Sequence, residues 1–170
     1  MVTYATQNLI ELREPDFYIV RMRVENLRSP YDKVRGLYNF GRMLDKIRLR
    51  TGGKLPPDYV LNCGAHNDAK TCAFLRIDYE ALVQRVLESS NDEEIADWCF
   101  SQGKKPTNEE IEVWNEYMRK VGWRDQTSKR IQQRKIESGF ADRDDIQTSF
   151  DYIELDEGRD PRERNARFSA

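Results

Sequence analysis

The chain has 170 residues, of which 34% are charged, and its formal net charge is −2. This length suits one domain with its own hydrophobic core, whereas the slightly acidic balance argues against a nucleic-acid-binding protein. No apolar run approaches the roughly 18 residues of a membrane span, and residues 1–14 lack the apolar core of a signal peptide. The three cysteines fit reduced thiols better than a disulfide framework. We therefore expect a cytoplasmic protein without a membrane partner.

Residues 1–28 are an N-terminal extension whose one predicted element is a strand. Over residues 17–24, apolar side chains alternate with other residues, as on the two faces of a strand. The best partner for this strand is residues 58–62, which follow the break at Pro56 and Pro57. The two segments would form a short β-hairpin.

The most strongly specified helix spans residues 30–50. Ser29 can cap its first turn, Pro30 fits the first helical position, and Gly52 and Gly53 end it. Its polar side chains fall on one narrow stripe, so most of its circumference is apolar. A surface helix needs a narrower apolar stripe. We therefore expect this helix to lie at the centre of the domain, contacted from several sides.

Cap residues and apolar spacing predict the helices that follow. Asp78, Asn91 and Thr107 each precede an amphipathic run and can accept hydrogen bonds from its first turn. Glu94 and Glu110 complete the capping-box spacing for two of them. The predicted helices cover residues 68–75, 79–89, 92–102, 108–121 and 126–138, and a last helix follows Asp142.

These elements predict a mainly α fold. We expect a compact bundle of about six helices around residues 30–50, in a single domain of residues 1–157. From Gly158 onward the residues are mostly charged. Residues 158–170 are therefore expected to form a disordered tail.

Two charged side chains fall on the apolar side of the helix over residues 30–50. Asp45 and Arg48 are three residues apart and can form an ion pair, and Arg42 is also three residues from Asp45. A carboxylate in apolar surroundings is costly unless it is paired or used. Three interpretations stay open. The first is a structural ion pair that fixes helix packing, and the second is a ligand-binding or catalytic carboxylate held by arginine. The third is that both side chains lie on a solvated face instead.

A second candidate site lies at Cys63, His66 and Cys72. This spacing offers soft metal ligands, but structural zinc sites usually have two close pairs of ligands, and the second pair is missing. We therefore predict no metal, and the absence of phosphate-binding and nucleotide-binding motifs predicts no cofactor. Cys63 and His66 could form a nucleophile–base pair. The alternative is a loop cysteine beside a solvent-facing histidine.

Short motifs also occur in order over roughly residues 26–157. They include Arg42-Met43-Leu44-Asp45-Lys46, Asn62-Cys63, Trp114-Asn115-Glu116 and Asp144-Asp145-Ile146. Together they resemble a bacterial family that is catalogued only as a domain of unknown function. The resemblance implies a small, helical, stand-alone protein and implies no activity. The chain departs from the family pattern after Cys63, so a site that the family shared there would be changed in this member.

The leading functional hypothesis is a protein that binds a small polar ligand in a cavity beside the helix over residues 30–50. Charged side chains of this helix would anchor a polar group of the ligand, and tryptophans would supply an apolar wall. The candidate ligand contacts are Arg42, Asp45, Lys46, Arg48, Trp98 and Trp114.

Two alternatives stay open. The first is a small cytoplasmic enzyme that acts on a polar molecule, with Asp45 as acid or base, or with Cys63 as nucleophile and His66 as base. The second is a protein-interaction adaptor, which would expose an apolar patch instead of a pocket. A homo-oligomer is compatible with each hypothesis.

Overall fold

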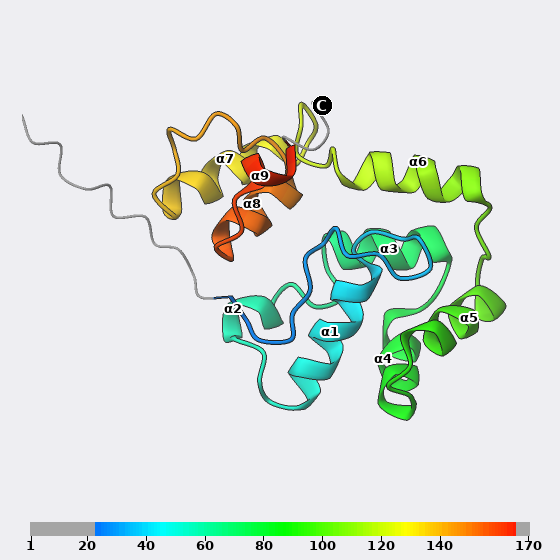
Figure 1. Cartoon of the computed structure of the whole chain (residues 1–170). Coiled ribbons are helices and arrows are strands. Elements are labelled where there is room, and N and C mark those ends of the chain that lie inside the picture. Colours follow the sequence, from blue (N-terminus) through cyan, green and yellow to red (C-terminus); the bar gives the residue numbers. More distant parts are fainter. Residues whose placement is uncertain (1–22, 166–170) are drawn as a thin grey trace, which may run out of the picture.

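The computed structural model describes residues 23–165, and within this range every regular element is a helix (Figure 1). The mainly α prediction is therefore confirmed, with nine helices among the described residues rather than about six. None of these helices is both long and apolar enough to cross a membrane. The helices are α1 (Phe40–Thr51), α2 (Pro57–Val60), α3 (Asn67–Leu75), α4 (Tyr79–Glu88), α5 (Asp92–Gln102), α6 (Asn108–Met118), α7 (Ser128–Glu137), α8 (Ser149–Asp156) and α9 (Pro161–Asn165).

The first helix begins later than predicted. α1 starts at Phe40, so the first part of the expected helix over residues 30–50 is not helical. Ser29 does organise the turn there, because its backbone N–H donates to Asp32 Oδ2 (3.1 Å) and its hydroxyl accepts from the Tyr31 N–H (3.1 Å). α1 packs against α2, α3 and α4. Its place at the centre of the whole bundle stays a prediction.

Left-handed backbone explains why the helix cannot begin earlier. Arg35, Gly36 and Asn39 have φ of 50°, 79° and 65°. Val34 and Leu37 exchange backbone hydrogen bonds across the first two of these residues (3.4 and 3.0 Å), as in a tight hairpin turn with positive φ at both central positions. A right-handed helix does not accommodate such residues, so α1 starts only after Asn39.

The predicted β-hairpin is wrong in its second segment. Pro57–Val60 form α2, because Pro57 takes the first helical position after the extended Pro56 (ψ 147°). The Tyr59 N–H donates to the Pro56 carbonyl (2.9 Å) and closes this helical turn. Residues 17–22 of the first segment lie outside the described part of the chain.

The helices predicted from their caps are confirmed. Asp78 accepts from the Ala81 N–H (2.9 Å) at the start of α4. Asn91 caps α5 by accepting from the Glu93 and Glu94 N–H groups, without the reciprocal backbone bond of the capping box predicted with Glu94. Thr107 and Glu110 form a complete capping box at α6. These caps involve residues three positions apart, which is why local sequence is enough to find them.

The end of the chain differs from the prediction made for it. The last long helix, α8, begins after Thr148, whose capping box is completed by Asp151, and not after Asp142. Within the expected tail the structure describes α9, and whether residues 158–170 form a disordered tail stays a prediction.

The described buried apolar residues form three clusters. The largest joins α1, α3, α4, α5 and α6 and includes Phe150 of α8. The second lies within α7, α8 and the segment between them and consists of Ile131, Phe140, Ile146, Tyr152 and Leu155. The third consists of Leu27, Leu49 and Leu55. α8 therefore belongs to two clusters and joins its end of the molecule to the rest.

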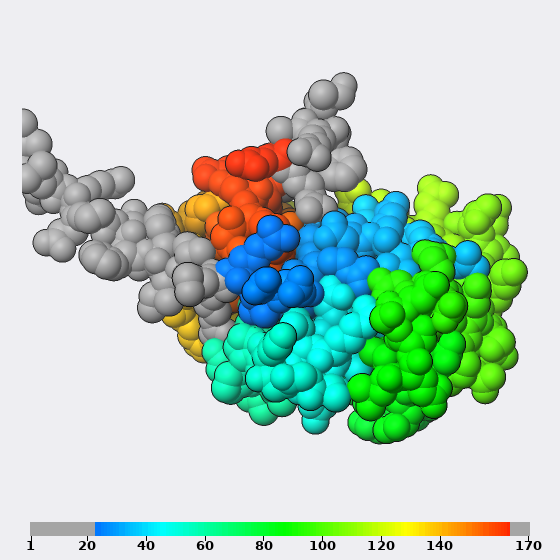
Figure 2. All heavy atoms as spheres, turned by 60° about the horizontal axis from the view of Figure 1, so that its bottom comes forward, coloured from blue at the N-terminus to red at the C-terminus, as the bar shows by residue number. Residues whose placement is uncertain are grey.

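The figures show how these parts are arranged. In Figure 1, α7, α8 and α9 gather at one end of the molecule, away from α4 and α5. In Figure 2 the segment over residues 23–39 (blue) lies between α8 and α9 (orange to red) and α1 (cyan). Tyr31 of this segment packs edge-on against Phe150, with ring centroids 5.0 Å apart.

We expect Thr107→Ala to lower the free energy of unfolding by about 1 kcal/mol, the usual effect of losing an N-cap. The substitution removes the hydroxyl that accepts from the Glu110 N–H (3.3 Å). Urea unfolding checks this, with Thr107→Ser as the matched control because serine keeps the cap. An equal loss of stability in both variants would contradict the prediction.

Candidate functional site

Asp45 lies in a cluster of two carboxylates and two guanidinium groups. It is 7% exposed and accepts hydrogen bonds from the Arg28 backbone N–H, Nε and Nη2 (3.0, 2.7 and 2.7 Å). Arg48 Nη1 lies 3.7 Å from Asp45 Oδ1, so the predicted ion pair is confirmed, with Arg28 as an additional partner. Asp92 pairs with both arginines, at 2.6 and 2.7 Å. Burial alone would raise the pKa of Asp92, but the hydrogen bonds from the arginines outweigh it and lower the pKa.

This cluster is balanced in charge and joins three segments of the chain. Arg28 precedes α1, Asp45 and Arg48 belong to α1, and Asp92 begins α5. Arg28 also donates to the Gly41 carbonyl (3.0 Å), and a Cβ atom at Gly41 would lie 3.0 Å from its guanidinium carbon. The arrangement therefore has the features of a structural ion cluster. Whether Asp45 also has a ligand-binding or catalytic role stays a prediction.

A cavity of about 260 Å³ lies between α1, α3, α7 and α8, away from this cluster. Three of the predicted site residues, Arg42, Lys46 and His66, line it. Its basic lining residues are Arg42, Lys46, Lys70, Arg130 and Arg134, and its acidic ones are Asp58, Asp156 and Glu157. The predicted site residues outside the lining are Asp45, Arg48, Cys63, Trp98 and Trp114.

Two of the basic residues are neutralised by buried carboxylates. Arg42 forms a two-pronged ion pair with Glu157, and their side chains are 5% and 1% exposed. Tyr59 and Arg159 also donate to Glu157, at 3.1 and 2.6 Å. Burial by itself would raise the pKa of Glu157, but Arg42 and Arg159 lower it. Lys46 pairs in the same way with Asp68.

Lys46 Nζ lies 2.6 Å from Oδ2 of Asp68, which is fully buried. The same oxygen accepts from the Gly64 N–H (3.2 Å). Gly64 has φ of 70°, and a Cβ atom there would meet the ring of Tyr79 at 2.8 Å. Glycine is therefore needed at this position to bring the loop close enough to bind Asp68.

The other three basic residues form a wall of the cavity and are not paired with a carboxylate within residues 23–165. Lys70, Arg130 and Arg134 are half-buried, and none of them has an acidic partner among the residues that the structure describes. Arg130 and Arg134 are four residues apart on α7, where like charges repel. Burial and the charge of Arg134 both lower the pKa of Arg130. We call these three residues the basic wall.

His66 directly precedes α3, and its side chain contacts Arg130 of the basic wall. Arg130 Nη1 lies 2.5 and 2.6 Å from its two ring nitrogens. Its backbone has φ of 51° and ψ of −110°, a conformation that costs energy in a residue with a side chain. Burial, followed by the charges of Arg130 and Lys70, lowers the pKa of His66 below 6.5. The imidazole is therefore neutral at pH 7.

The two thiols of the second candidate site are protonated at neutral pH and therefore weakly reactive. The Cys63 thiol donates to the Tyr59 carbonyl (3.7 Å), and burial raises its pKa. Burial raises the pKa of Cys72 to about 12. Such thiols are poor nucleophiles at neutral pH. Within the described part of the chain, no three histidine, cysteine or acidic side chains are grouped as metal ligands would be.

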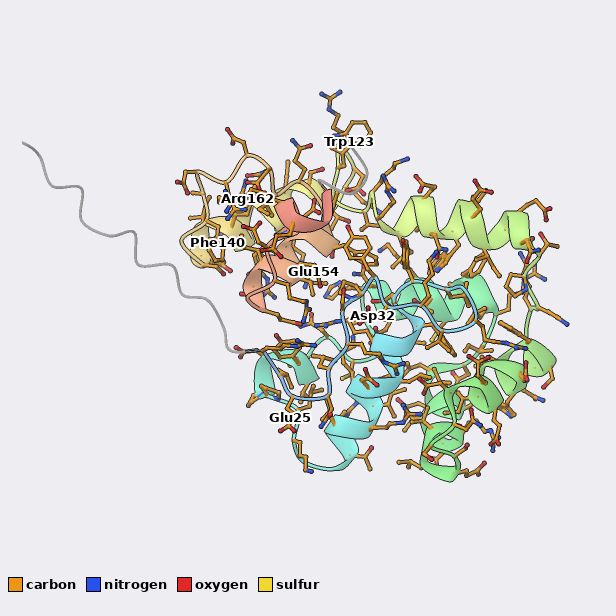
Figure 3. All side chains as sticks on the ribbon, in the orientation of Figure 1. Glu25, Asp32, Trp123, Phe140, Glu154 and Arg162 are labelled. Atoms are coloured by element: carbon orange, nitrogen blue, oxygen red, sulfur yellow. The ribbon has the colours of Figure 1, made fainter. Side chains whose placement is uncertain are left out.

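The tryptophans lie apart from the cavity. Trp114 is 5% exposed and stacks on Phe74 between α6 and α3, with ring centroids 4.5 Å apart. Trp98 packs against the largest apolar cluster. Trp123 lies on the turn between α6 and α7 at the outside of the molecule (Figure 3), where it is 47% exposed.

Sequence reasoning missed the basic wall and the buried acceptor Glu157. The signal for part of the wall is visible, since two arginines four residues apart share one face of the very polar helix α7. The positions of Lys70 and Glu157 in the same cavity as these arginines depend on which helices pack against each other. Lys70 and Arg130 are brought to one cavity by the packing of distant segments, and spacing along the chain does not reveal that.

We expect Asp45→Ala to lower the free energy of unfolding by about 3 kcal/mol, the lower end for breaking a buried ion pair, because Arg28 and Arg48 are each 30% exposed and keep contact with water. Thermal and urea unfolding measure this loss. Asp142→Ala, at an exposed position, is the control and should change stability by less than about 0.5 kcal/mol. An Asp45→Ala variant as stable as the natural protein would contradict a structural role for the cluster.

Comparison with known proteins agrees with the resemblance in the sequence motifs. The family model described as "Domain of unknown function (DUF5069)" matches residues 24–159. No curated protein that was compared with the chain matches it. The resemblance to a family of unknown function is confirmed, and the chain belongs to the DUF5069 family.

Proposed function

We propose that this protein binds a small anionic molecule in the cavity between α1, α3, α7 and α8. The observation that carries the proposal is the basic wall of Lys70, Arg130 and Arg134, which is half-buried and lacks carboxylate partners among the described residues. A cation that is partly withdrawn from water is stabilised by a negatively charged partner. A bound anion would supply the missing partner.

The chemistry of the wall suits a carboxylate or a phosphate-type group. Arginine offers several donors in a planar fork that matches two acceptor oxygens at once. Arg130 and Arg134 repel each other when the cavity holds only water, and an anion between them would turn this repulsion into two favourable contacts. Lys70 on α3 would add a third donor from the facing side.

The size of the cavity favours a small metabolite. The cavity volume is about 260 Å³. It lies just below the usual range for drug-sized ligands. Val121, Ile131 and Ile153 add apolar surface to the lining, so the ligand would combine a charged group with a short apolar part.

This proposal keeps two of the ligand contacts expected from the sequence and replaces the others. Arg42 and Lys46 line the cavity, and their own carboxylate partners hold them in place. The proposed anchor moves from Asp45 to the basic wall, because Asp45 lies in a balanced ion cluster outside the lining.

A small enzyme is the second candidate, and one observation favours it. His66 is exposed and lines the cavity. It combines a costly backbone conformation with an imidazole whose pKa is lowered, and such combinations occur at active sites. In this version His66 would act as a base without Cys63, whose thiol is protonated and lies outside the lining.

We expect Arg134→Gln to weaken anion binding about tenfold, or about 1.4 kcal/mol, because it removes one charged donor of the wall. Binding is measured by calorimetry and by the rise in unfolding temperature with sodium sulfate, sodium phosphate and a small dicarboxylate, against sodium chloride of equal ionic strength. Lys129→Gln is the matched control. It lies on the same helix, makes the same change in charge, and is exposed outside the lining.

Two outcomes would contradict the proposal. The first is a natural protein that none of these anions stabilises beyond the effect of chloride. The second is an equal loss of binding in Arg134→Gln and Lys129→Gln, which would mean that the anions respond only to net charge.

A further inference from the structure

His66 lines the cavity beside Arg130, so the protonation of its imidazole depends on the charge of a ligand bound there. It is the only histidine of the chain, and its ring nitrogens contact Arg130 Nη1 at 2.5 and 2.6 Å. A second positive charge on the imidazole would lie directly against the guanidinium group. The free cavity therefore holds His66 neutral by geometry as well as by burial.

The charged groups around His66 come from every helix that borders the cavity. The cations are Lys46 of α1, Lys70 of α3, and Arg130 and Arg134 of α7, and the carboxylates of the lining are Asp58 of α2 and Asp156 with Glu157 of α8. Lys46 and Glu157 are held in ion pairs of their own. The basic wall is thus the part of this field that a ligand can change.

We infer that His66 takes up one proton from solvent when a doubly charged anion binds to the basic wall. This inference rests on the proposed function. The anion accepts hydrogen bonds from Arg130 and draws the guanidinium away from the imidazole. With the negative charge in place, the imidazolium form is stabilised, and both ring nitrogens become donors. The proton ends on the ring nitrogen that is unprotonated in the neutral imidazole, and no covalent bond is made.

The direction of the pH effect follows from linkage. In the free protein the pKa of His66 is lowered by burial and by the neighbouring cations, and a bound dianion raises it. Protons are taken up between these two pKa values, so affinity increases as the pH falls through the bound-state value and levels off below the free-state value. Each unit of difference between the two values is worth a factor of ten in affinity.

Sulfate is the probe that isolates this effect, because it stays a dianion throughout the range in which histidine titrates. Calorimetry at one pH in two buffers of different ionisation enthalpy counts the protons taken up. We expect close to one proton per bound sulfate between the two pKa values, and an affinity that rises about tenfold or more toward low pH. Since the chain has one histidine, a single imidazole signal in the NMR spectrum reports both values.

Variants separate the role of His66 from that of the cavity as a whole. His66→Asn removes the titrating ring and keeps a residue that tolerates positive φ, so the pH dependence of sulfate affinity should vanish. Arg130→Gln removes a positive charge beside His66 and should raise the pKa of His66. This change can be measured in the ligand-free protein. Lys129→Gln is the control and should preserve the pH dependence of binding.

The outcomes distinguish this inference from the function on which it rests. Sulfate binding without proton uptake, or an unchanged pH dependence in His66→Asn, would overturn the inference and leave anion binding in place. An unchanged His66 pKa in free Arg130→Gln would also overturn it. Failure of every tested anion to bind at any pH would overturn both.

Discussion

The ion pair between Arg42 and Glu157 is the contact on which the two ends of the molecule depend. The residues are 115 positions apart, and both side chains are almost fully withdrawn from water. Each charge is tolerable there only because the other is present. Tyr59 and Arg159 complete the hydrogen bonding of the carboxylate. The pair links the end of α8 to α1, as Phe150 links α8 to the largest apolar cluster, and α7 shares a small apolar cluster with α8.

Charge balance separates the two polar regions of this protein. Around Asp45, two carboxylates meet two guanidinium groups, and every charge has a partner in the structure. Such a group holds helices together and offers a ligand little to gain. Along the basic wall, Lys70, Arg130 and Arg134 have no acidic partners among the described residues. These three side chains are only half-buried, but a negative charge beside them would still be stabilised more than at the first region, where the charges already balance.

Sequence reasoning succeeded where the deciding contact is local. Asp78, Asn91 and Thr107 each cap a helix through an atom two or three residues away, and all three helices form. It failed before α1, because the apolar spacing of residues 30–39 suits a helix while the backbone of Arg35 and Asn39 turns left-handed. Arginine has no special preference for that conformation, so only the folded chain reveals it. The ion pair of Asp45 with Arg48 is local and could be predicted. The cavity joins residues such as His66 and Arg130, which are 64 positions apart, and that pairing depends on tertiary packing.

The helices that line the cavity lie far apart in the sequence, so they leave the ribosome at different times during synthesis. α1 to α5 and most of the large apolar cluster are synthesised first, and at that stage Arg42 has no Glu157 to meet. Until α8 is synthesised, the Arg42 guanidinium lacks the carboxylate that pairs with it in the folded protein, and contacts between residues so far apart in sequence form slowly. Docking of α8 would both bury that charge and complete the lining of the cavity, so the cavity would form only after the residues of α8 have been synthesised.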